Sequence, residues 1–212
     1  MRSFRLALTF VVVACGVAAA QQGPDLDKIL ADIRAKDKGQ LAVSEEDGRF
    51  LRLLIASSSR KRALEIGGAS GYSAIWMAQG LRATGGKLVT IEYDPVRAKE
   101  LAENIKRAGF SDIVQVVAGD AFAEIPKLQG TFDLVFLDAW KPDYIEYYEA
   151  VVPKLSDRGV LVADNVLARG QVLEGERGHA LQAFNEHVQA DPRVDNVLLT
   201  VGDGLMLAWR TA

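Results

Sequence analysis

Three polar residues stand where two apolar segments of the chain end. Asp138 follows the apolar segment 134–137, and Asp164 and Asn165 follow the apolar segment 160–163. If both segments are strands of one sheet, two carboxylates and one amide oxygen meet at neighbouring strand ends. Such oxygen donors are the ligands that hard divalent cations such as Mg²⁺, Mn²⁺ and Ca²⁺ prefer. The sequence therefore predicts a divalent-cation site formed by these three residues.

Lys141 follows Asp138 by three residues, in the same predicted loop. A lysine beside a bound cation is a candidate general base. Each of these residues also has an ordinary structural interpretation. A loop lysine is usually solvated, and Asp164-Asn165 is a common turn or helix N-cap pair. Only their joint position favours a catalytic site.

A glycine-rich turn, residues 65–71, joins a predicted strand to a helix that opens at Ser73. Gly67 and Gly71 permit tight backbone turns and close approach of a ligand. The helix N-terminus presents free N–H groups that suit a carboxylate or a phosphate. A dinucleotide fingerprint needs glycine where this turn has Ala69 and Tyr72, so NAD and FAD are disfavoured. An ordinary strand-to-helix turn remains the structural alternative.

Two further acids end the next two predicted strands. Glu92 is placed to accept both ribose hydroxyls of a nucleoside, although a solvated strand end is the alternative. Asp120 could accept a hydrogen bond from an adenine amino group or cap the helix that begins at Ala121. His179 and His187 lie eight residues apart, which is not a metal-ligand spacing, so we interpret them as surface or packing residues.

Apolar periodicity predicts strands that alternate with helices. The expected strands are residues 63–66, 87–92, 113–118, 132–137, 160–163, 194–201 and 205–209. The expected helices are residues 25–36, one from Ser44, 73–81, 95–108, a short one after 120, 144–152 and 178–190. This alternation predicts an α/β fold with a seven-stranded, mostly parallel sheet and helices on both faces. Residues 202–204 join the last two strands as an antiparallel hairpin.

The composition describes a globular protein without a basic surplus. The chain has 212 residues, and its net charge is −3. We expect one domain over residues 21–212. The negative balance argues against a nucleic-acid partner, because no excess of lysine and arginine exists to neutralise phosphates.

The first 20 residues have the pattern of a secretory signal peptide: a basic start, an apolar stretch and small residues before Gln21. We expect cleavage after Ala20 and export to the periplasm or the medium. The only cysteine, Cys15, offers an alternative, because the sequence before it resembles the box of bacterial lipoproteins. A lipidated or uncleaved N-terminus would place the protein at a membrane. If translation instead starts downstream of Met1, the protein would lack this segment and would be cytoplasmic.

Together the turn, the acid at 92 and the two strand ends resemble the cation-dependent O-methyltransferases, the family of the catechol and caffeoyl-CoA enzymes. The resemblance covers about residues 38–209. It rests on Glu65-Ile66-Gly67 with Gly71-Tyr72-Ser73, on Asp138-Ala139-Trp140-Lys141, on Ala163-Asp164-Asn165-Val166 and on Gly202-Asp203-Gly204-Leu205. It implies a Rossmann-like class I methyltransferase fold, S-adenosylmethionine (SAM) as methyl donor, and Mg²⁺ or another hard divalent cation.

The resemblance also implies roles for single residues. Val43 would touch the methionine part of SAM through its backbone, Ser73 would hold its carboxylate and Glu92 its ribose. Lys141 would be the base. The implied metal ligands are Asp138, Asp164 and Asn165. The implied cofactor-binding residues are Val43, Glu65, Gly67, Gly71, Tyr72, Ser73, Glu92, Tyr93, Asp120, Ala121 and Trp140.

The sequence departs from the catechol enzymes in one place. They carry a glutamate shortly before the closing hairpin, whereas residues 198–201 read Leu-Leu-Thr-Val. A catechol-like vicinal dihydroxy aromatic is still the expected acceptor, with a non-catechol acceptor as one alternative. A non-catalytic exported protein that binds a nucleoside-like metabolite is the other. Relatives of this kind are commonly homodimers, and the segment 21–41 is the candidate dimer element.

Overall fold

The computed structural model describes residues 23–38 and 41–211. The predicted signal peptide, its cleavage position after Ala20 and the alternative lipidation position Cys15 all lie outside the described residues. The same holds for parts of the candidate dimer element 21–41. Within the described part, no helix combines the length and the apolar character needed to cross a membrane.

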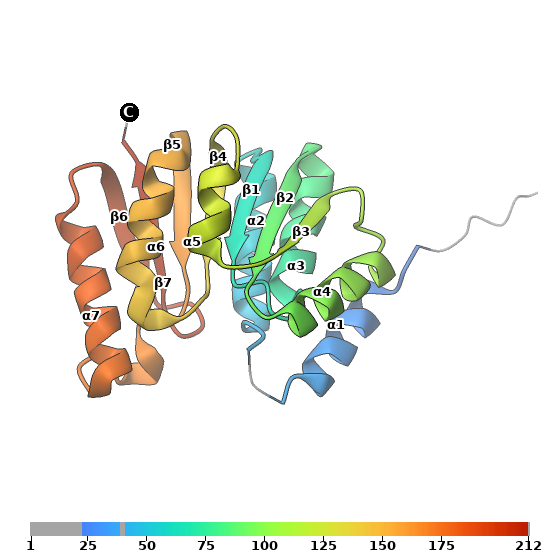
Figure 1. Ribbon diagram of the computed structural model, residues 1–212, viewed down its shortest axis with the longest axis horizontal. Coiled ribbons are helices and arrows are strands. Elements are labelled where there is room, and N and C mark those ends of the chain that lie inside the picture. Colours follow the sequence, from blue (N-terminus) through green and yellow to red (C-terminus); the bar gives the residue numbers. More distant parts are fainter. Residues whose placement is uncertain (1–22, 39–40, 212) are drawn as a thin grey trace, which may run out of the picture.

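A seven-stranded sheet forms the centre of the molecule (Figure 1). Its strand order is β3-β2-β1-β4-β5-β7-β6. The first five strands pair in parallel, and β7 lies antiparallel to both β5 and β6. The strands are β1 (Arg62–Ile66), β2 (Lys87–Glu92), β3 (Val114–Ala118), β4 (Phe132–Leu137), β5 (Leu155–Ala163), β6 (Val194–Leu199) and β7 (Leu205–Arg210).

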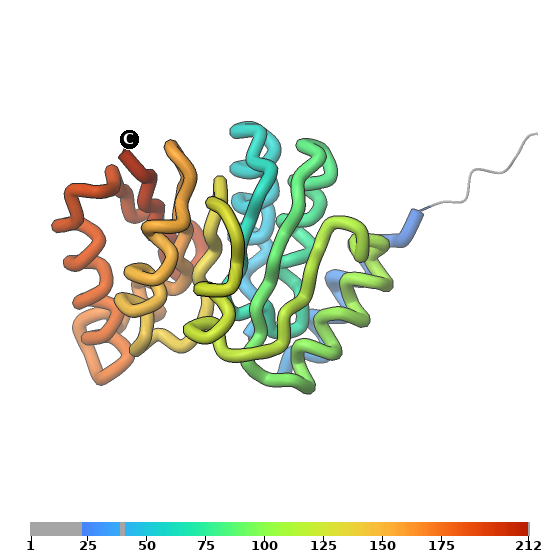
Figure 2. The backbone as a smooth tube through the Cα atoms, turned by 45° about the horizontal axis from the view of Figure 1, so that its top comes forward, coloured from blue at the N-terminus to red at the C-terminus, as the bar shows by residue number. Residues whose placement is uncertain are grey.

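Seven α-helices of the described chain cover the two faces of this sheet (Figure 2). One apolar core joins α1 to α4 to the sheet, and the other joins α5 to α7 to the opposite face. The helices are α1 (Leu26–Lys36), α2 (Glu45–Ser57), α3 (Tyr72–Thr84), α4 (Pro95–Arg107), α5 (Ala121–Glu124), α6 (Tyr144–Val151) and α7 (Gly175–Ala190). A 3₁₀ turn, η2 (Lys141–Asp143), precedes α6.

Local sequence sets the starts of these helices. The Asp25 side chain caps α1, and Asp94 caps α4, in which Pro95 occupies the first turn. Ser44 and Asp47 form a reciprocal capping box at the start of α2. Gly71 opens α3 in the left-handed conformation, with φ of 90°. Each device supplies an acceptor or a backbone geometry that the first turn of the helix lacks.

The predicted architecture is confirmed, and the differences lie at element ends. Strand β5 begins at Leu155 rather than 160, because its first residues also pair with β4 across an irregularity between Phe132 and Leu134. Strand β6 ends at Leu199, since Thr200 and Val201 already belong to the hairpin turn. Helix α7 begins at Gly175, before its first regular apolar position.

Candidate active site

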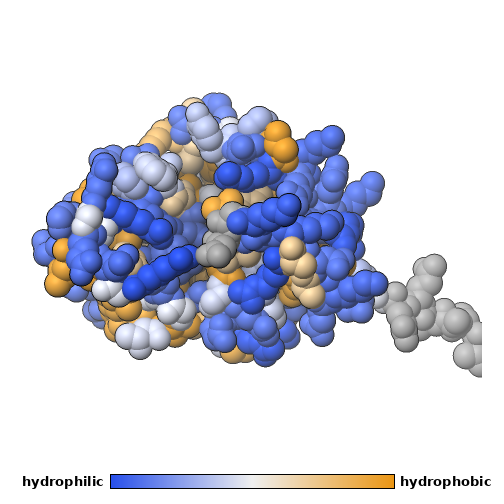
Figure 3. Space-filling view, turned by 90° about the horizontal axis from the view of Figure 1, so that it is seen from below, coloured by the Kyte–Doolittle hydropathy of each residue, from blue (hydrophilic) through white to orange (hydrophobic). Residues whose placement is uncertain are grey.

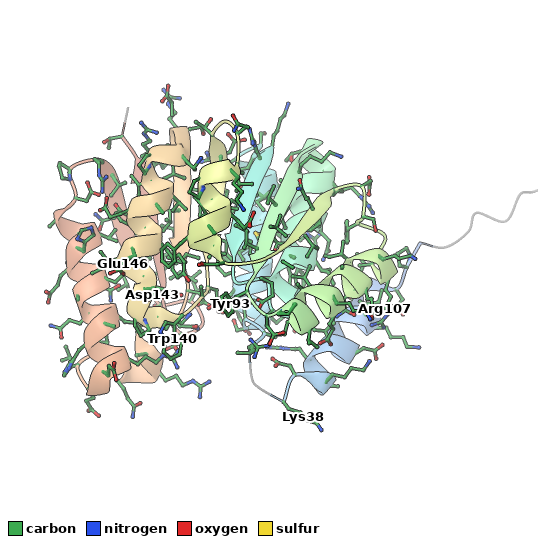
Figure 4. All side chains as sticks on the ribbon, in the orientation of Figure 1. Lys38, Tyr93, Arg107, Trp140, Asp143 and Glu146 are labelled. Carbon is green, nitrogen blue, oxygen red and sulfur yellow. The ribbon has the colours of Figure 1, made fainter. Side chains whose placement is uncertain are left out.

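Apart from Val43, which precedes α2, the predicted site residues lie at the carboxyl ends of β1 to β5. In Figure 4, Tyr93 after β2 and Trp140 after β4 lie at the same lower edge of the molecule. Both side chains are exposed, Tyr93 to 77% and Trp140 to 69%. Figure 3 views this edge, whose rim is mostly hydrophilic. In doubly wound sheets, ligands bind in the crevice at this edge.

Lys141 and Asp138 form a close pair in this edge. The Lys141 Nζ donates to Asp138 Oδ1 at 2.5 Å. Lys141 is the first residue of the η2 turn and is buried, with 8% of its surface exposed. The alternative of a solvated loop lysine is therefore wrong. A buried ammonium needs a charged partner, and Asp138 supplies it.

Tyr144, the first residue of α6, fixes the lysine from its other side. Lys141 Nζ donates to the Tyr144 hydroxyl at 2.6 Å, and that hydroxyl reaches the carbonyl oxygen of Asp164 at 3.0 Å. Burial, followed by the negative charges of Asp138 and Asp164, raises the pKa of Tyr144 well above its ordinary value. The hydroxyl therefore keeps its proton and ties the loops after β4 and β5 together.

Asp164 carries a buried oxygen without a protein partner. Its Oδ1 accepts from the Asn165 backbone N–H at 2.6 Å, whereas Oδ2 has no hydrogen-bond partner among the described residues. Burial, then the charges of Asp138 and Asp47, raises the pKa of Asp164. Asn165 takes a left-handed φ of 58°, as in a tight turn. An orphaned buried carboxylate oxygen is costly unless a ligand satisfies it.

The donor set of Asp138, Asp164 and Asn165 fits a hard divalent cation by its chemistry, because it offers only oxygen ligands. Over residues 23–38 and 41–211, no group of three or more His, Cys, Asp or Glu side chains is placed to hold a metal ion. The predicted set contains two acids and one amide, so any further ligands would come from water or substrate.

The glycine turn after β1 is pressed between the two neighbouring strands. Gly67 has φ of 94°, and its N–H donates to the Ile91 carbonyl of β2 at 2.9 Å. On the other side, a Cβ at Gly67 would overlap the carbonyl oxygen of Asp138. Only glycine fits this position, because an L side chain would be strained and would clash with the backbone.

Glu65 lies fully buried beneath this turn. Its Oε1 accepts from the Ser73 hydroxyl at 2.5 Å, which ties the end of β1 to the first turn of α3. Burial raises the pKa of Glu65 to about 7, against the lowering effect of the bond from Ser73. The predicted cofactor residues Glu65 and Ser73 are therefore in contact with each other.

This raised pKa makes a prediction for Glu65→Gln. Between pH 4.5 and 7 the unfolded chain loses the Glu65 proton and the folded chain keeps it, so wild-type stability falls as pH rises. The loss amounts to about 3 kcal/mol above pH 7. Glutamine cannot titrate, so the free energy of unfolding of the variant, measured with urea, should rise relative to wild type by about 3 kcal/mol between pH 4.5 and 8. A constant difference over this range would contradict the shift.

Glu92 and Asp120 already bind backbone N–H groups. Glu92 Oε2 accepts from Ala69 at 2.8 Å, which fixes the glycine turn, and Oε1 accepts from Asp94 at 2.9 Å. Asp120 Oδ1 accepts from Phe122 at 3.0 Å. The helix-cap interpretation of Asp120 is thus confirmed, and Ala121 follows it buried at the start of α5.

Sequence reasoning missed Arg34 of α1. Its guanidinium donates to the Val43 carbonyl at 3.2 Å and lies over the Tyr72 ring, 5.1 Å from the ring centre. The loop before α2 is further fixed by Asp37, whose Oδ2 accepts from Ala42 N–H at 2.6 Å. Val43 and Tyr72 are both predicted cofactor residues, and α1 braces both. An arginine on a polar helix face gives no sequence signal for this.

The two histidines lie on α7. His179 Nε2 is 3.2 Å from the Leu173 carbonyl oxygen, and His187 Nε2 is 2.7 Å from Glu149 Oε1. His187 also packs edge-on against Tyr148. The interpretation of both as surface or packing residues is confirmed.

The strand order and the glycine turn at the crevice define a class I SAM-dependent methyltransferase. A family model described as O-methyltransferase matches residues 19–211. The chain is 42% identical over 182 residues to a catechol O-methyltransferase of Niastella koreensis, covering 79% of this chain and 81% of that protein. It is 39% identical over 198 residues to a catechol O-methyltransferase of Mycobacterium tuberculosis, covering 87% and 88%.

A solved O-methyltransferase of Bacillus cereus, in complex with S-adenosylhomocysteine (SAH), superposes with a TM-score of 0.80 at 32% identity, covering 88% of this chain and 90% of that one. The chain belongs to the O-methyltransferase family, and its activity is SAM-dependent O-methyl transfer. The alternative of a non-catalytic binding protein is therefore set aside.

Proposed function

We propose that the chain is a divalent-metal-dependent O-methyltransferase that methylates one hydroxyl of a small vicinal dihydroxy aromatic. The observation that carries the proposal is the Lys141–Asp138 pair beside the orphaned Oδ2 of Asp164. Two relatives named catechol O-methyltransferase support the acceptor class.

Asp138, Asp164 and Asn165 would hold the cation. When bound, it would supply a positive charge that favours the ionised form of a neighbouring hydroxyl. Lys141 Nζ, in the uncharged amine form that the charge of a bound cation would favour, would take the proton from the acceptor hydroxyl. Tyr144 and Asp138 hold that nitrogen in place, and positioning of this kind lowers the barrier by avoiding lost motional freedom.

The residues of the turn would bind and orient the methyl donor. Gly67 and Gly71 would allow close approach at the end of β1, and Glu92, which fixes the turn through Ala69 N–H, would accept from the ribose hydroxyls. Trp140 and Tyr93, exposed at the crevice rim, would cover the adenine and the acceptor. Water exclusion then depends on ligand binding, because both rings are exposed without it.

The test is a methyl-transfer assay with SAM and a panel of phenols, catechols and thioester-linked phenols, each with Mg²⁺ and with a chelator. Turnover of a catechol that stops with chelator supports the proposal. Turnover that ignores the chelator contradicts metal dependence. Turnover confined to acceptors without adjacent hydroxyls would contradict the proposed acceptor class. That result would fit the lack of a glutamate in residues 198–201, where the catechol enzymes carry one.

Lys141→Met should lower kcat by about 100-fold, the usual loss on removing a general base. SAH affinity should stay near the wild-type value, because Lys141 contacts Asp138 and Tyr144 rather than the glycine turn. Lys141→Arg should not restore turnover, since a guanidinium does not give up its proton. Recovery of activity in the arginine variant would show that charge alone suffices.

Export by a signal peptide over residues 1–20 remains a proposal. Expression of the full chain in a bacterial host, followed by N-terminal sequencing of the periplasmic protein, tests it. A new N-terminus at Gln21 supports cleavage after Ala20. A lipid-modified Cys15 or an intact cytoplasmic chain would replace that proposal.

A further inference from the structure

One buried carboxylate near the site has no place in the roles described so far. Asp47, in the first turn of α2, is 1% exposed. Its Oδ2 accepts from the Ser44 backbone N–H at 3.1 Å, and Ser44 Oγ accepts from the Asp47 N–H at 3.0 Å. Its Oδ1 has no hydrogen-bond partner among the described residues. Helix capping therefore explains one oxygen of this carboxylate and not the other.

The chain path places Asp47 against the closing hairpin. A Cβ at Gly202 would overlap both carboxylate oxygens of Asp47, so only a glycine leaves room for them. The same hairpin accepts hydrogen bonds from the segment that follows Asp164 and Asn165: Val166 N–H donates to Gly204 at 3.1 Å, and Leu167 N–H to Asp203 at 3.0 Å. Asp47 thus contacts the hairpin that binds the segment just after Asp164 and Asn165.

The charges around Asp164 are unbalanced within the protein. Three carboxylates, those of Asp164, Asp138 and Asp47, interact with one another, and one ammonium, that of Lys141, opposes them. Repulsion between buried carboxylates is costly, and a divalent cation bound among them would relieve it.

We infer that Asp47 is a positioning residue that strengthens divalent-cation binding by the ligands Asp138, Asp164 and Asn165. This inference rests on the proposed metal dependence. No three acids of the described residues are placed to share an ion, so Asp47 would not bind it directly together with both Asp138 and Asp164. It acts through its charge, or through a water bound to the cation, as outer-sphere carboxylates do.

The test measures Mn²⁺ binding by electron paramagnetic resonance, without SAM or acceptor, so it does not depend on turnover. Asp47→Asn keeps the shape and the oxygen that accepts from Ser44, and removes the charge. We expect it to bind Mn²⁺ about ten-fold more weakly than wild type. Asp47→Ser removes the same charge with a smaller side chain and serves if the asparagine variant does not fold.

Two controls separate charge at this position from other effects. Ser44→Ala removes the capping hydroxyl but keeps the carboxylate, and Glu46→Gln removes an exposed charge from the same turn. Both should bind Mn²⁺ within two-fold of wild type. Equal weakening in Ser44→Ala and Asp47→Asn would overturn the inference, because helix capping would then be the cause.

Asp138→Ala separates this inference from the proposed function. If Asp138→Ala loses Mn²⁺ binding and Asp47→Asn matches wild type, the cation site stands and the role of Asp47 is overturned. If wild type binds no Mn²⁺, or Asp138→Ala binds it as wild type does, the metal proposal itself is overturned, and the role of Asp47 falls with it.

Discussion

Replacing Asp138 with alanine is expected to reduce methyl transfer by at least about 1000-fold. The substitution removes one of two carboxylates proposed to hold the cation and also removes the counterion of Lys141, whose Nζ lies 2.5 Å from Asp138 Oδ1. Loss of a charge partner leaves the buried ammonium uncompensated, and loss of electrostatic stabilisation alone often costs 100- to 1000-fold in rate. The two losses occur in the same variant, so we expect the larger effect.

The measurement is kcat with Mg²⁺, together with SAH affinity by calorimetry. SAH binding should stay within a few-fold of wild type, because the glycine turn, Glu92 and Ser73 are unchanged. Asp143→Ala is the matched control, because it removes an acid from the same loop, two residues after Lys141. The Asp143 side chain makes no helix-cap hydrogen bond, so its loss should leave α6 intact. Retention of more than a tenth of wild-type turnover in Asp138→Ala would contradict the proposed site.

The second large effect is expected at Gly67. Alanine there would hold φ near 94° and would place Cβ against the Asp138 carbonyl oxygen. Backbone strain of this kind costs about 1–3 kcal/mol, and overpacking adds about 1–3 kcal/mol. Gly67→Ala should therefore lower the free energy of unfolding by about 4 kcal/mol.

Gly85→Ala isolates the strain from the clash. Gly85 has φ of 72°, and no atom lies within 4 Å of a Cβ built there. It should lose only about 1 kcal/mol, the cost of a left-handed alanine. Urea unfolding of both variants measures the difference. Equal destabilisation would mean that the Asp138 carbonyl moves aside without cost.

The fold could be predicted from the sequence because its signals are local. Strand and helix periods, the capping residues Ser44 and Asp94, and Pro95 at the start of α4 each act within a few residues. The element ends at 155, 175 and 199 could not be predicted, since pairing with neighbouring strands and packing decide them.

The site residues that directly follow strands could be predicted from the sequence. Residues that follow adjacent parallel strands lie at the same edge of the sheet. The proximity of Asp138 and Asp164 could therefore be predicted from the sequence alone. Contacts between distant segments gave no such signal. The contacts of Arg34 with Val43 and Tyr72, and of Asp47 with Gly202, depend on how α1 and α2 pack against distant parts of the chain.

Helix α1 sets a limit on how far the protein can be shortened. Arg34 holds the Val43 carbonyl and the Tyr72 ring, and Asp25 caps the helix that carries it. A chain truncated beyond α1 would keep every strand and every predicted cofactor residue, yet it would lose the contacts that fix Val43 and Tyr72. A cut between Asp25 and Lys36 is therefore expected to weaken cofactor binding, whereas cleavage at the predicted position after Ala20 would leave α1 whole.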